Sequence, residues 1–428
     1  DCSKLDQWEV VFEHMDELGI QLHVVLQETE NDNGSLGLDG GSLGLQRKLY
    51  HRELVARFSH HLAVVWNMGE ENTNTTSQQI AFDEHLESLD PYDHPIVVHT
   101  FPTTTDQVYG PLSDQQVLDG ASLQVNSISA VHQLTGTWVK ESAADGNPWV
   151  VTLDEHGPFL IGARPDAYDY WHDNERAWGM WGNLMAGGGG FEWYFGYNYP
   201  NNDLDLEDYR SRDHLWDLSR YAREFFEKYL PFQEMEPSDN LVNGNGATWC
   251  YSKPGEVYAV YLRFGGTATL NLPAGTGDLV VKWYDPRNGG ELQDGSVTTV
   301  SGPGTVSLGV PPNNTSSDWA VLVKRANTAP EVFFTLAAPN PYQGVGPLAF
   351  YVGAPDPDGD FEVQDVLLHF FLPNGQYLAA FPCLEATSGF WVFELPQLQL
   401  LPGVWPMVAQ VVDSYGESSY RVFSFSSQ

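Results

Sequence analysis

The chain has 428 residues, 42% of them hydrophobic, and a formal net charge of −37 that arises from 20 Lys and Arg against 57 Asp and Glu. A field of that sign repels nucleic acid and anionic membranes, so both are excluded as partners. No apolar run reaches the length of about 18 residues that a transmembrane helix needs, and none is expected.

The first 230 residues alternate between helical and strand patterns. Residues 4–19 predict an amphipathic helix, with Ser3 as its N-cap and Gly19 just past its end. A second amphipathic helix is predicted over 213–230. Short apolar runs between them predict six strands, at 20–27, 62–67, 95–100, 121–125, 148–154 and 191–196. Strands that are apolar throughout and alternate with helices are typical of a parallel sheet covered by helices.

Six parallel strands are two fewer than a closed (β/α)8 barrel contains. Because the sequence begins on a helix, we expect residues 1–231 to form such a barrel, with its first two βα units lying upstream of Asp1. The alternative is a six-stranded open, doubly wound sheet. That fold requires no further units, but the glycine-rich phosphate turn typical of it is missing from this sequence.

After Pro231 the pattern changes to short strands separated by Gly and Pro turns. Residues 232–326 predict an antiparallel β-sandwich. Residues 327–428, which begin within the linker ANTAPE (326–331), repeat the pattern and predict a second sandwich of the Ig or cadherin kind. The expected fold class is therefore α/β plus all-β, a barrel followed by two sandwiches.

The predicted strand ends carry carboxylates, amides and one imidazole. In a barrel, residues at the carboxyl ends of the strands form the active site. Glu70 and Glu71 follow directly on VVWN, and Glu155 lies three strands later in VVTLDEHG. Two carboxylates that face each other across a cleft are the groups that hydrolyse glycosides, one as a proton donor and one as an ionised nucleophile. A salt-bridge network at the barrel mouth, or metal ligation, is the alternative.

The segments WNMGEEN and WVVTLDEHG resemble the strand-four and strand-seven signatures of clan A retaining glycoside hydrolases. DCSKLDQWE and HVVLQETEN extend the resemblance to one bacterial group of this clan. Residues 257–325, with WYDPRNGG, resemble a domain that this group often carries, named as the collagen-binding domain of collagenase. The resemblance covers residues 1 to about 230 and implies that Glu71 is the acid/base, that Glu155 is the nucleophile, and that the protein is secreted, periplasmic or on the cell surface.

Two positions depart from the clan's pattern. The asparagine that contacts the sugar 2-hydroxyl is Glu70 here, so Glu70 is a rival to Glu71 for the role of acid. The tyrosine usual after the sixth barrel strand has no counterpart in ASLQVNS, and Asn67 or Gln124 are candidates for the 2-hydroxyl contact. The expected substrate-binding residues are Glu70, Asn67, His99, Gln124, Trp193, Glu30 and Asn31.

The stretch 168–199 is rich in Trp and Tyr, whose faces pack against the C–H faces of sugars. Core filling is expected to account for most of these residues. Trp193 follows the last predicted strand, where a barrel glycosidase places a sugar platform, so it is the best single candidate.

Other signals are weaker. Asp356, Asp358 and Asp360 alternate in a way that suits calcium, although a plain turn is the stronger interpretation, and no other cofactor is expected. H-E-x-x-H does not occur, which argues against a zinc peptidase. The cysteines, Cys2, Cys250 and Cys383, have neither disulfide nor zinc-site spacing.

The sequence therefore predicts a retaining glycoside hydrolase that cleaves a polysaccharide or oligosaccharide by double displacement. The acidity hints at a marine or algal glycan, and the oligomeric state stays open. Two other classes are alternatives: a non-catalytic carbohydrate-binding or adhesion protein with a degenerate barrel, and a lyase acting on uronic-acid polymers. The lyase requires basic groups near the substrate carboxylate, whereas the strand ends here are acidic.

Overall fold

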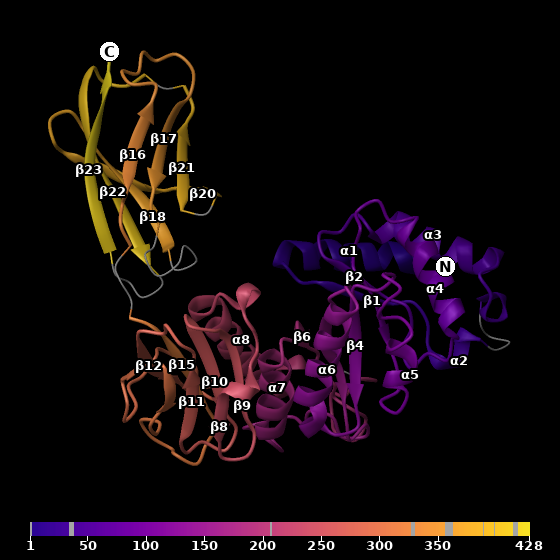
Figure 1. The fold of residues 1–428 in the computed structure, drawn as a ribbon. Helices are drawn as coiled ribbons and strands as arrows, with labels where there is room; N and C mark the ends of the chain where they lie inside the picture. Colours follow the sequence, from indigo (N-terminus) through magenta and orange to yellow (C-terminus); the bar gives the residue numbers. More distant parts are fainter. Residues whose placement is uncertain are drawn as a thin grey trace.

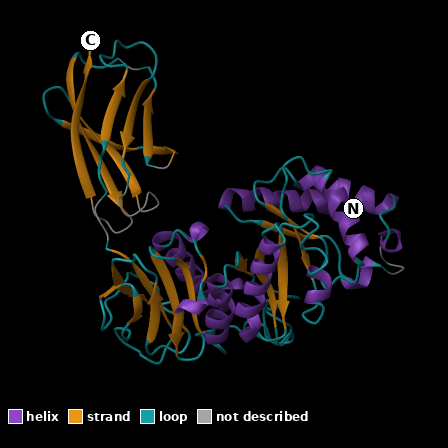
Figure 2. Ribbon diagram, in the orientation of Figure 1, coloured by secondary structure: helices purple, strands orange, loops and turns teal. Residues whose placement is uncertain are grey.

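A computed structural model describes residues 2–33, 38–205, 208–326, 330–355, 363–387, 389–397, 399–413 and 418–428. Helices are concentrated in the first 230 residues, and the rest of the chain is almost wholly strand and loop (Figure 2). Among the described helices, none is long and apolar enough to cross a membrane.

The first part of the chain contains the six predicted strands in one parallel sheet, which confirms that prediction (Figure 1). In space, as in sequence, they follow the order β1 (Leu22–Val25), β2 (Val64–Asn67), β3 (Ile96–His99), β4 (Gly120–Val125), β5 (Val150–His156) and β6 (Gly190–Phe191). Every residue of β3 and β4 is buried, as is typical of central strands in a parallel sheet whose two faces are both covered.

The helices that pack around this sheet are α1 (Cys2–Leu18), α2 (Thr29–Asp32), α3 (Leu45–Phe58), α4 (Thr76–Glu87), α5 (Thr105–Tyr109), α6 (Val131–Ala144), α7 (Trp181–Met185) and α8 (Asp213–Tyr229). Both predicted amphipathic helices are present, as α1 and α8. The apolar face of α8 is buried, whereas α1 packs on the core through Leu5, Phe12 and Met15 and leaves Trp8 exposed.

The parallel sheet is an open half-barrel in the part of the chain that the structure describes. Hydrogen bonding runs from β1 to β6, and no strand pairing joins β6 back to β1 among these residues. A closed (β/α)8 barrel is therefore not confirmed. The half-barrel still brings all six carboxyl ends of its strands to one edge, which is the feature that positions the site.

Two antiparallel sheets follow the half-barrel. The first has the order β13 (Thr299–Ser301), β12 (Asp278–Tyr284), β15 (Trp319–Arg325), β10 (Val257–Leu262), β9 (Thr248–Lys253) and β7 (Glu236–Pro237). The second has the order β14 (Gly304–Ser307), β11 (Ala268–Leu272) and β8 (Val242–Gly244). A hydrophobic cluster with Trp283 and Trp319 fills the space between them.

Two further antiparallel sheets form the last part of the chain. One has the order β16 (Phe334–Ala338), β17 (Leu348–Gly353), β21 (Phe390–Leu395) and β20 (Leu384–Thr387). The other has the order β19 (Tyr377–Pro382), β18 (Val363–Phe371), β22 (Gly403–Asp413) and β23 (Ser418–Ser427). Phe350 and Trp405 belong to their shared core.

The expected division at residue 231 falls inside one continuous hydrophobic cluster. Phe225 of α8 belongs to the same cluster as Tyr261 of β10 and Tyr284 of β12. In Figure 1, α7 lies between the parallel sheet and the antiparallel sheet that contains β10. Arg176, in the π-helix η3 (Glu175–Met180), donates to both carboxylate oxygens of Asp318 at 2.8 and 3.0 Å, and both residues are buried. The end of the half-barrel is thus packed firmly against the β-sheets that follow it.

Candidate active site

A cavity of about 610 Å³ lies at the carboxyl edge of the half-barrel, and residues on or after every strand line it. Its volume is in the usual range for small-molecule sites. The lining residues are His23, Val25, Glu28, Thr29, Asn67, Glu70, Glu71, His99, Ser122, Asp154, Glu155, Phe159, Glu192, Tyr194, Tyr197 and Asp203.

Glu71 and Glu155 converge in this cavity through a shared hydrogen-bond donor. The side-chain nitrogen Nε2 of Gln124 donates to Glu71 Oε1 at 3.0 Å and to Glu155 Oε2 at 2.6 Å. Because both bonds meet on one nitrogen, the two carboxylate oxygens cannot be farther apart than the sum of those distances. Gln124 is buried in β4, so its amide holds the two carboxylates in a fixed relation.

A bulge in the β4–β5 pairing aims Glu155 at this point. The register shifts after Leu123, so that Gln124 pairs with Glu155 and Asp154 is left as the extra residue. An extra residue in one strand reverses the side to which the following side chains point. The bulge therefore turns Glu155 toward Gln124 and keeps Asp154 in the cavity lining as well.

Glu70 and Glu71 both line the cavity although they are adjacent in the chain. In an extended strand, consecutive side chains point to opposite faces. Glu71 adopts a left-handed conformation with φ of 46°, which breaks that alternation and is uncommon for a residue with a side chain. Its carbonyl oxygen accepts a hydrogen bond from the hydroxyl of Thr29, and the Glu70 N–H donates to the carbonyl of Gln27. These contacts hold the strained turn in place.

The ionisation of the cavity carboxylates is shifted strongly. Burial, and then the charges of Glu28, Glu155, Glu192 and Glu71, raise the pKa of Glu70 to about 8. Burial also raises the pKa of Glu155 to about 7, although the hydrogen bond from Gln124 acts in the opposite direction. At neutral pH, Glu70 is therefore mostly protonated while Glu155 is divided between its two forms.

A group of polar side chains connects the strand ends beneath the carboxylates. His99 Nδ1 lies 3.1 Å from Ser122 Oγ, and its Nε2 lies 3.8 Å from Glu155 Oε2. Burial lowers the pKa of His99 to about 4, so its ring is neutral. Asn67 contacts Nε2 of His23 at 3.1 Å and Ser122 Oγ at 3.3 Å. Asn67 and His99 both line the cavity, and their contact with a substrate stays a prediction.

The prediction that Trp193 forms a sugar platform is wrong. Its side chain is 8% exposed, packs against Phe191 and donates from Nε1 to Ser219 Oγ at 3.0 Å. Residues after β6 alternate, so Glu192 and Tyr194 face the cavity while Trp193 faces the hydrophobic layer under α8.

Other aromatic side chains are available to a ligand. Phe159 is 62% exposed and Tyr197 is 44% exposed, and both line the cavity. The hydroxyl of Tyr194 donates to the carbonyl of Phe159 at 2.6 Å, which joins the loops after β5 and β6.

The remaining predicted residues have different outcomes. Gln124 acts on the carboxylate pair and does not belong to the cavity lining. Glu30 and Asn31 lie in α2, but their side chains are outside the described part of the structure. The weak calcium candidates Asp356, Asp358 and Asp360 also lie outside the described residues.

Sequence reasoning did not select several residues that line the cavity: His23, Glu28, Asp154, Glu192, Asp203, Phe159, Tyr194 and Tyr197. Glu28, Asp154 and Tyr194 lie at predicted strand ends, although they are not among the predicted site residues. Strict alternation after β6 could have found Glu192. Asp203 and Phe159 come from loops, where no sequence pattern fixes direction.

The cavity also contains two groups that could hold a metal ion. Ligand atoms of Glu70, His99 and Glu155 lie within 4.8 Å of one another, and so do those of His23, Asp154 and Glu192. Metal ligation, the alternative considered for these carboxylates, is thus compatible with their arrangement.

Comparison with known proteins identifies the fold and not a family. No family model matches this chain, and no curated protein matches it. A solved glycoside hydrolase aligns with a TM-score of 0.56 and 14% identity over 75% of this chain and 77% of its own. A candidate glycoside hydrolase from Bacteroides vulgatus aligns with a TM-score of 0.52 and 17% identity over 75% of this chain. The match spans 63% of that protein's length. The chain therefore shares its fold with glycoside hydrolases.

Proposed function

We propose that this protein is a retaining glycoside hydrolase in which Glu155 is the nucleophile and Glu71 the acid/base. The hydrogen bonds from one Gln124 amide to both carboxylates carry this proposal. Retaining enzymes hold their two carboxyl groups about 5–5.5 Å apart, whereas inverting enzymes separate them by about 6.5–9.5 Å to admit a water. A shared donor at 3.0 and 2.6 Å limits the separation of the nearest oxygens to less than the inverting range.

The reaction proceeds in two displacements. The ionised carboxylate of Glu155 attacks the anomeric carbon while Glu71 protonates the departing glycosidic oxygen, which leaves a glycosyl ester on Glu155. Glu71 then removes a proton from water, and that water hydrolyses the ester. His99 is neutral and lies 3.8 Å from Glu155 Oε2, so it cannot neutralise the nucleophile by holding a charge at pH 7.

Glu70 serves in this proposal as a hydrogen-bond donor to a sugar hydroxyl. Its raised pKa, about 8, keeps it protonated at neutral pH, and a protonated carboxyl donates where an asparagine amide would donate. The same raised pKa makes it the rival acid. Substitution of Glu70 and Glu71 in turn separates the two roles. Loss of the acid should slow cleavage of a substrate whose leaving group needs a proton, and should slow much less the cleavage of one whose leaving group needs none.

The charge of the cavity favours a neutral glycan. Seven lining residues are acidic, Glu28, Glu70, Glu71, Asp154, Glu155, Glu192 and Asp203, and none of the lining residues in the described structure is Lys or Arg. A uronic acid or a sulfate ester would be repelled there. A neutral polysaccharide, of algal or plant origin, suits the site better, with Phe159 and Tyr197 as the surfaces for stacking. The proposal places such an enzyme outside the cytoplasm, where polysaccharides are encountered.

The experiment is a screen of the protein against neutral and uronic-acid polysaccharides, with release of reducing ends as the signal. Proton NMR of the first product should give the anomer of the substrate. Glu155→Ala should lower kcat at least about a thousandfold, since the nucleophile is removed. The surface variant Glu141→Ala is the matched control.

Each outcome of the screen is informative. A near-normal rate in Glu155→Ala, or an inverted product, would overturn the assignment of Glu155 as nucleophile. Glycan binding without release of reducing ends would favour the adhesion alternative. An unsaturated product that absorbs in the near ultraviolet would identify a lyase.

A further inference from the structure

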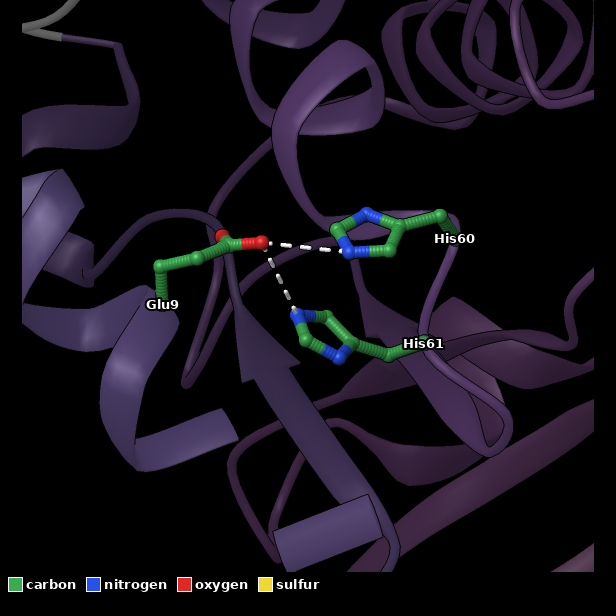
Figure 3. A group of neighbouring side chains, drawn as sticks. All are labelled: Glu9, His60 and His61. Carbon is green, nitrogen blue, oxygen red and sulfur yellow. Dashed lines mark ion pairs between the residues drawn. The ribbon is translucent and has the colours of Figure 1, made fainter. Parts of the chain in front are cut away.

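Another cluster of ligand-type side chains lies away from the cavity, before β2 and not after it. Glu9 comes from α1, and His60 and His61 come from the turn between α3 and β2 (Figure 3). His60 Nε2 lies 3.1 Å from Glu9 Oε1, and His61 Nε2 lies 3.8 Å from the same oxygen. Both imidazole rings turn one nitrogen toward the carboxylate in Figure 3.

An ion pair between Glu9 and His60 does not explain why a nitrogen of His61 is buried without a hydrogen-bond partner among the described residues. Its side chain is fully buried, and its Nε2 has no hydrogen-bond partner within the described structure. A buried polar nitrogen without a partner is costly, and such atoms are rare in folded proteins. A cation between the three side chains would give this nitrogen a partner.

Asp16 fixes His61 in the form that a metal ion requires. Asp16 Oδ2 lies 2.8 Å from His61 Nδ1, and Asp16 is also on α1, seven residues after Glu9. The backbone N–H of Leu62 donates to the other oxygen of Asp16, Oδ1, at 3.2 Å, so hydrogen bonds hold both oxygens of this carboxylate in place. An ionised carboxylate can only accept, so Nδ1 carries the proton and Nε2 presents its lone pair. Carboxylate, histidine and metal are joined in this way in many zinc sites.

The distances suit a small tetrahedral ion. Zinc binds imidazole nitrogen and carboxylate oxygen at about 2.0–2.2 Å, which places tetrahedral ligand atoms about 3.4 Å apart. The two distances to Glu9 Oε1 lie on either side of this value, and all three ligand atoms lie within 4.8 Å of one another. Two histidines with one glutamate form an established zinc ligand set that leaves a fourth position for water.

We propose that Glu9, His60 and His61 bind a zinc ion that fastens α1 to the turn before β2. This site would be structural, because it lies before β2, at the end of the sheet opposite the cavity. A metal ion there would hold α1 in place, because the side chains by which the described part of α1 contacts the core are only partly buried, and its Trp8 and Val11 are exposed. The proposal is independent of the proposed glycosidase activity.

The test is zinc binding to the full chain after removal of metal with a chelator, measured by competition with a chromophoric zinc chelator. His60→Gln is the informative variant, because this side chain is 51% exposed and its loss should leave the fold intact. Zinc affinity should fall more than about 100-fold, since a direct ligand contributes more than a supporting residue does. His14→Gln is the matched control, because His14 is on α1 with Glu9, pairs with Glu17 instead of the proposed site, and is 66% exposed. Its zinc affinity should equal that of the wild type.

Asp16→Asn gives a second test of the zinc site, because a simple ion pair between Glu9 and His60 predicts no change in zinc affinity in this variant. Loss of the supporting carboxylate should weaken zinc binding about 10–100-fold. Zinc should also raise the Tm of the wild type and not that of His60→Gln. Unchanged zinc affinity and stoichiometry in His60→Gln would overturn the proposal. Loss of zinc binding in Glu155→Gln would also overturn it, because that result would place the ion in the cavity.

Discussion

Gln124→Leu tests whether one amide organises the catalytic pair. The substitution keeps the volume of the side chain in its buried position on β4 and removes both hydrogen bonds to Glu71 and Glu155. The bond to Glu155 is 2.6 Å long and favours the ionised carboxylate, which lowers its pKa. A hydrogen bond to a charged group is worth about 1.5–3 kcal/mol, and about 1.4 kcal/mol corresponds to one pKa unit.

The magnitude follows from these values. The pKa of Glu155 is about 7, so about half of the nucleophile is ionised at pH 7. Taking the lower end of the range, loss of the bond raises that pKa by about one unit and leaves about a tenth ionised. We expect kcat/KM at pH 7 to fall about fivefold from ionisation alone. The acidic limb of the pH profile should move up by about one unit, so that part of the loss is recovered at pH 9.

The assay is kcat/KM between pH 5 and 9 on a glycan that the wild type cleaves, with Gln133→Leu, an exposed residue of α6, as the control. Circular dichroism and Tm should establish that both variants are folded. An acidic limb at the wild-type pH in Gln124→Leu would refute the reasoning, because it would mean that the amide does not set the ionisation of Glu155.

Three other predictions concern stability. Asp318→Asn should lower the free energy of unfolding by about 3–5 kcal/mol in urea denaturation, because it removes the buried charge partner of the Arg176 guanidinium and leaves only the exposed Asp173 paired with it; a loss below about 1 kcal/mol would contradict this. Glu70→Gln should raise Tm, and more at pH 8 than at pH 5: the pKa of Glu70 is raised from 4.5 to about 8 in the folded state, so the fold holds a proton that the unfolded chain releases, and stability falls as the pH rises through that window. A Tm difference independent of pH would count against the raised pKa. Trp193→Phe should cost about 1 kcal/mol of stability through loss of the bond to Ser219 while leaving kcat/KM unchanged; a large fall in kcat/KM at unchanged stability would restore Trp193 as a sugar contact.

The sequence alone determined where the six parallel strands lie and which of their ends carry carboxylates. Apolar runs of strand length, separated by helical patterns, are sufficient for this, because burial on both faces of a parallel sheet requires continuous apolar strands. The convergence of Glu71 and Glu155 also follows from topology, since the carboxyl ends of parallel strands meet at one edge. The contact through Gln124 agrees with that expectation.

The tertiary structure decided the direction of individual side chains. One left-handed residue at Glu71 and one bulge beside Gln124 each reverse the alternation, and neither leaves a pattern in the sequence. The sequence does not show whether Trp193 faces the cavity or the hydrophobic layer under α8, because the packing of its neighbours, and not its own residue type, decides between these two directions. Contacts between segments far apart in the chain, such as Glu9 with His60, depend on how helices pack on the sheet, and residue spacing carries no information about that packing.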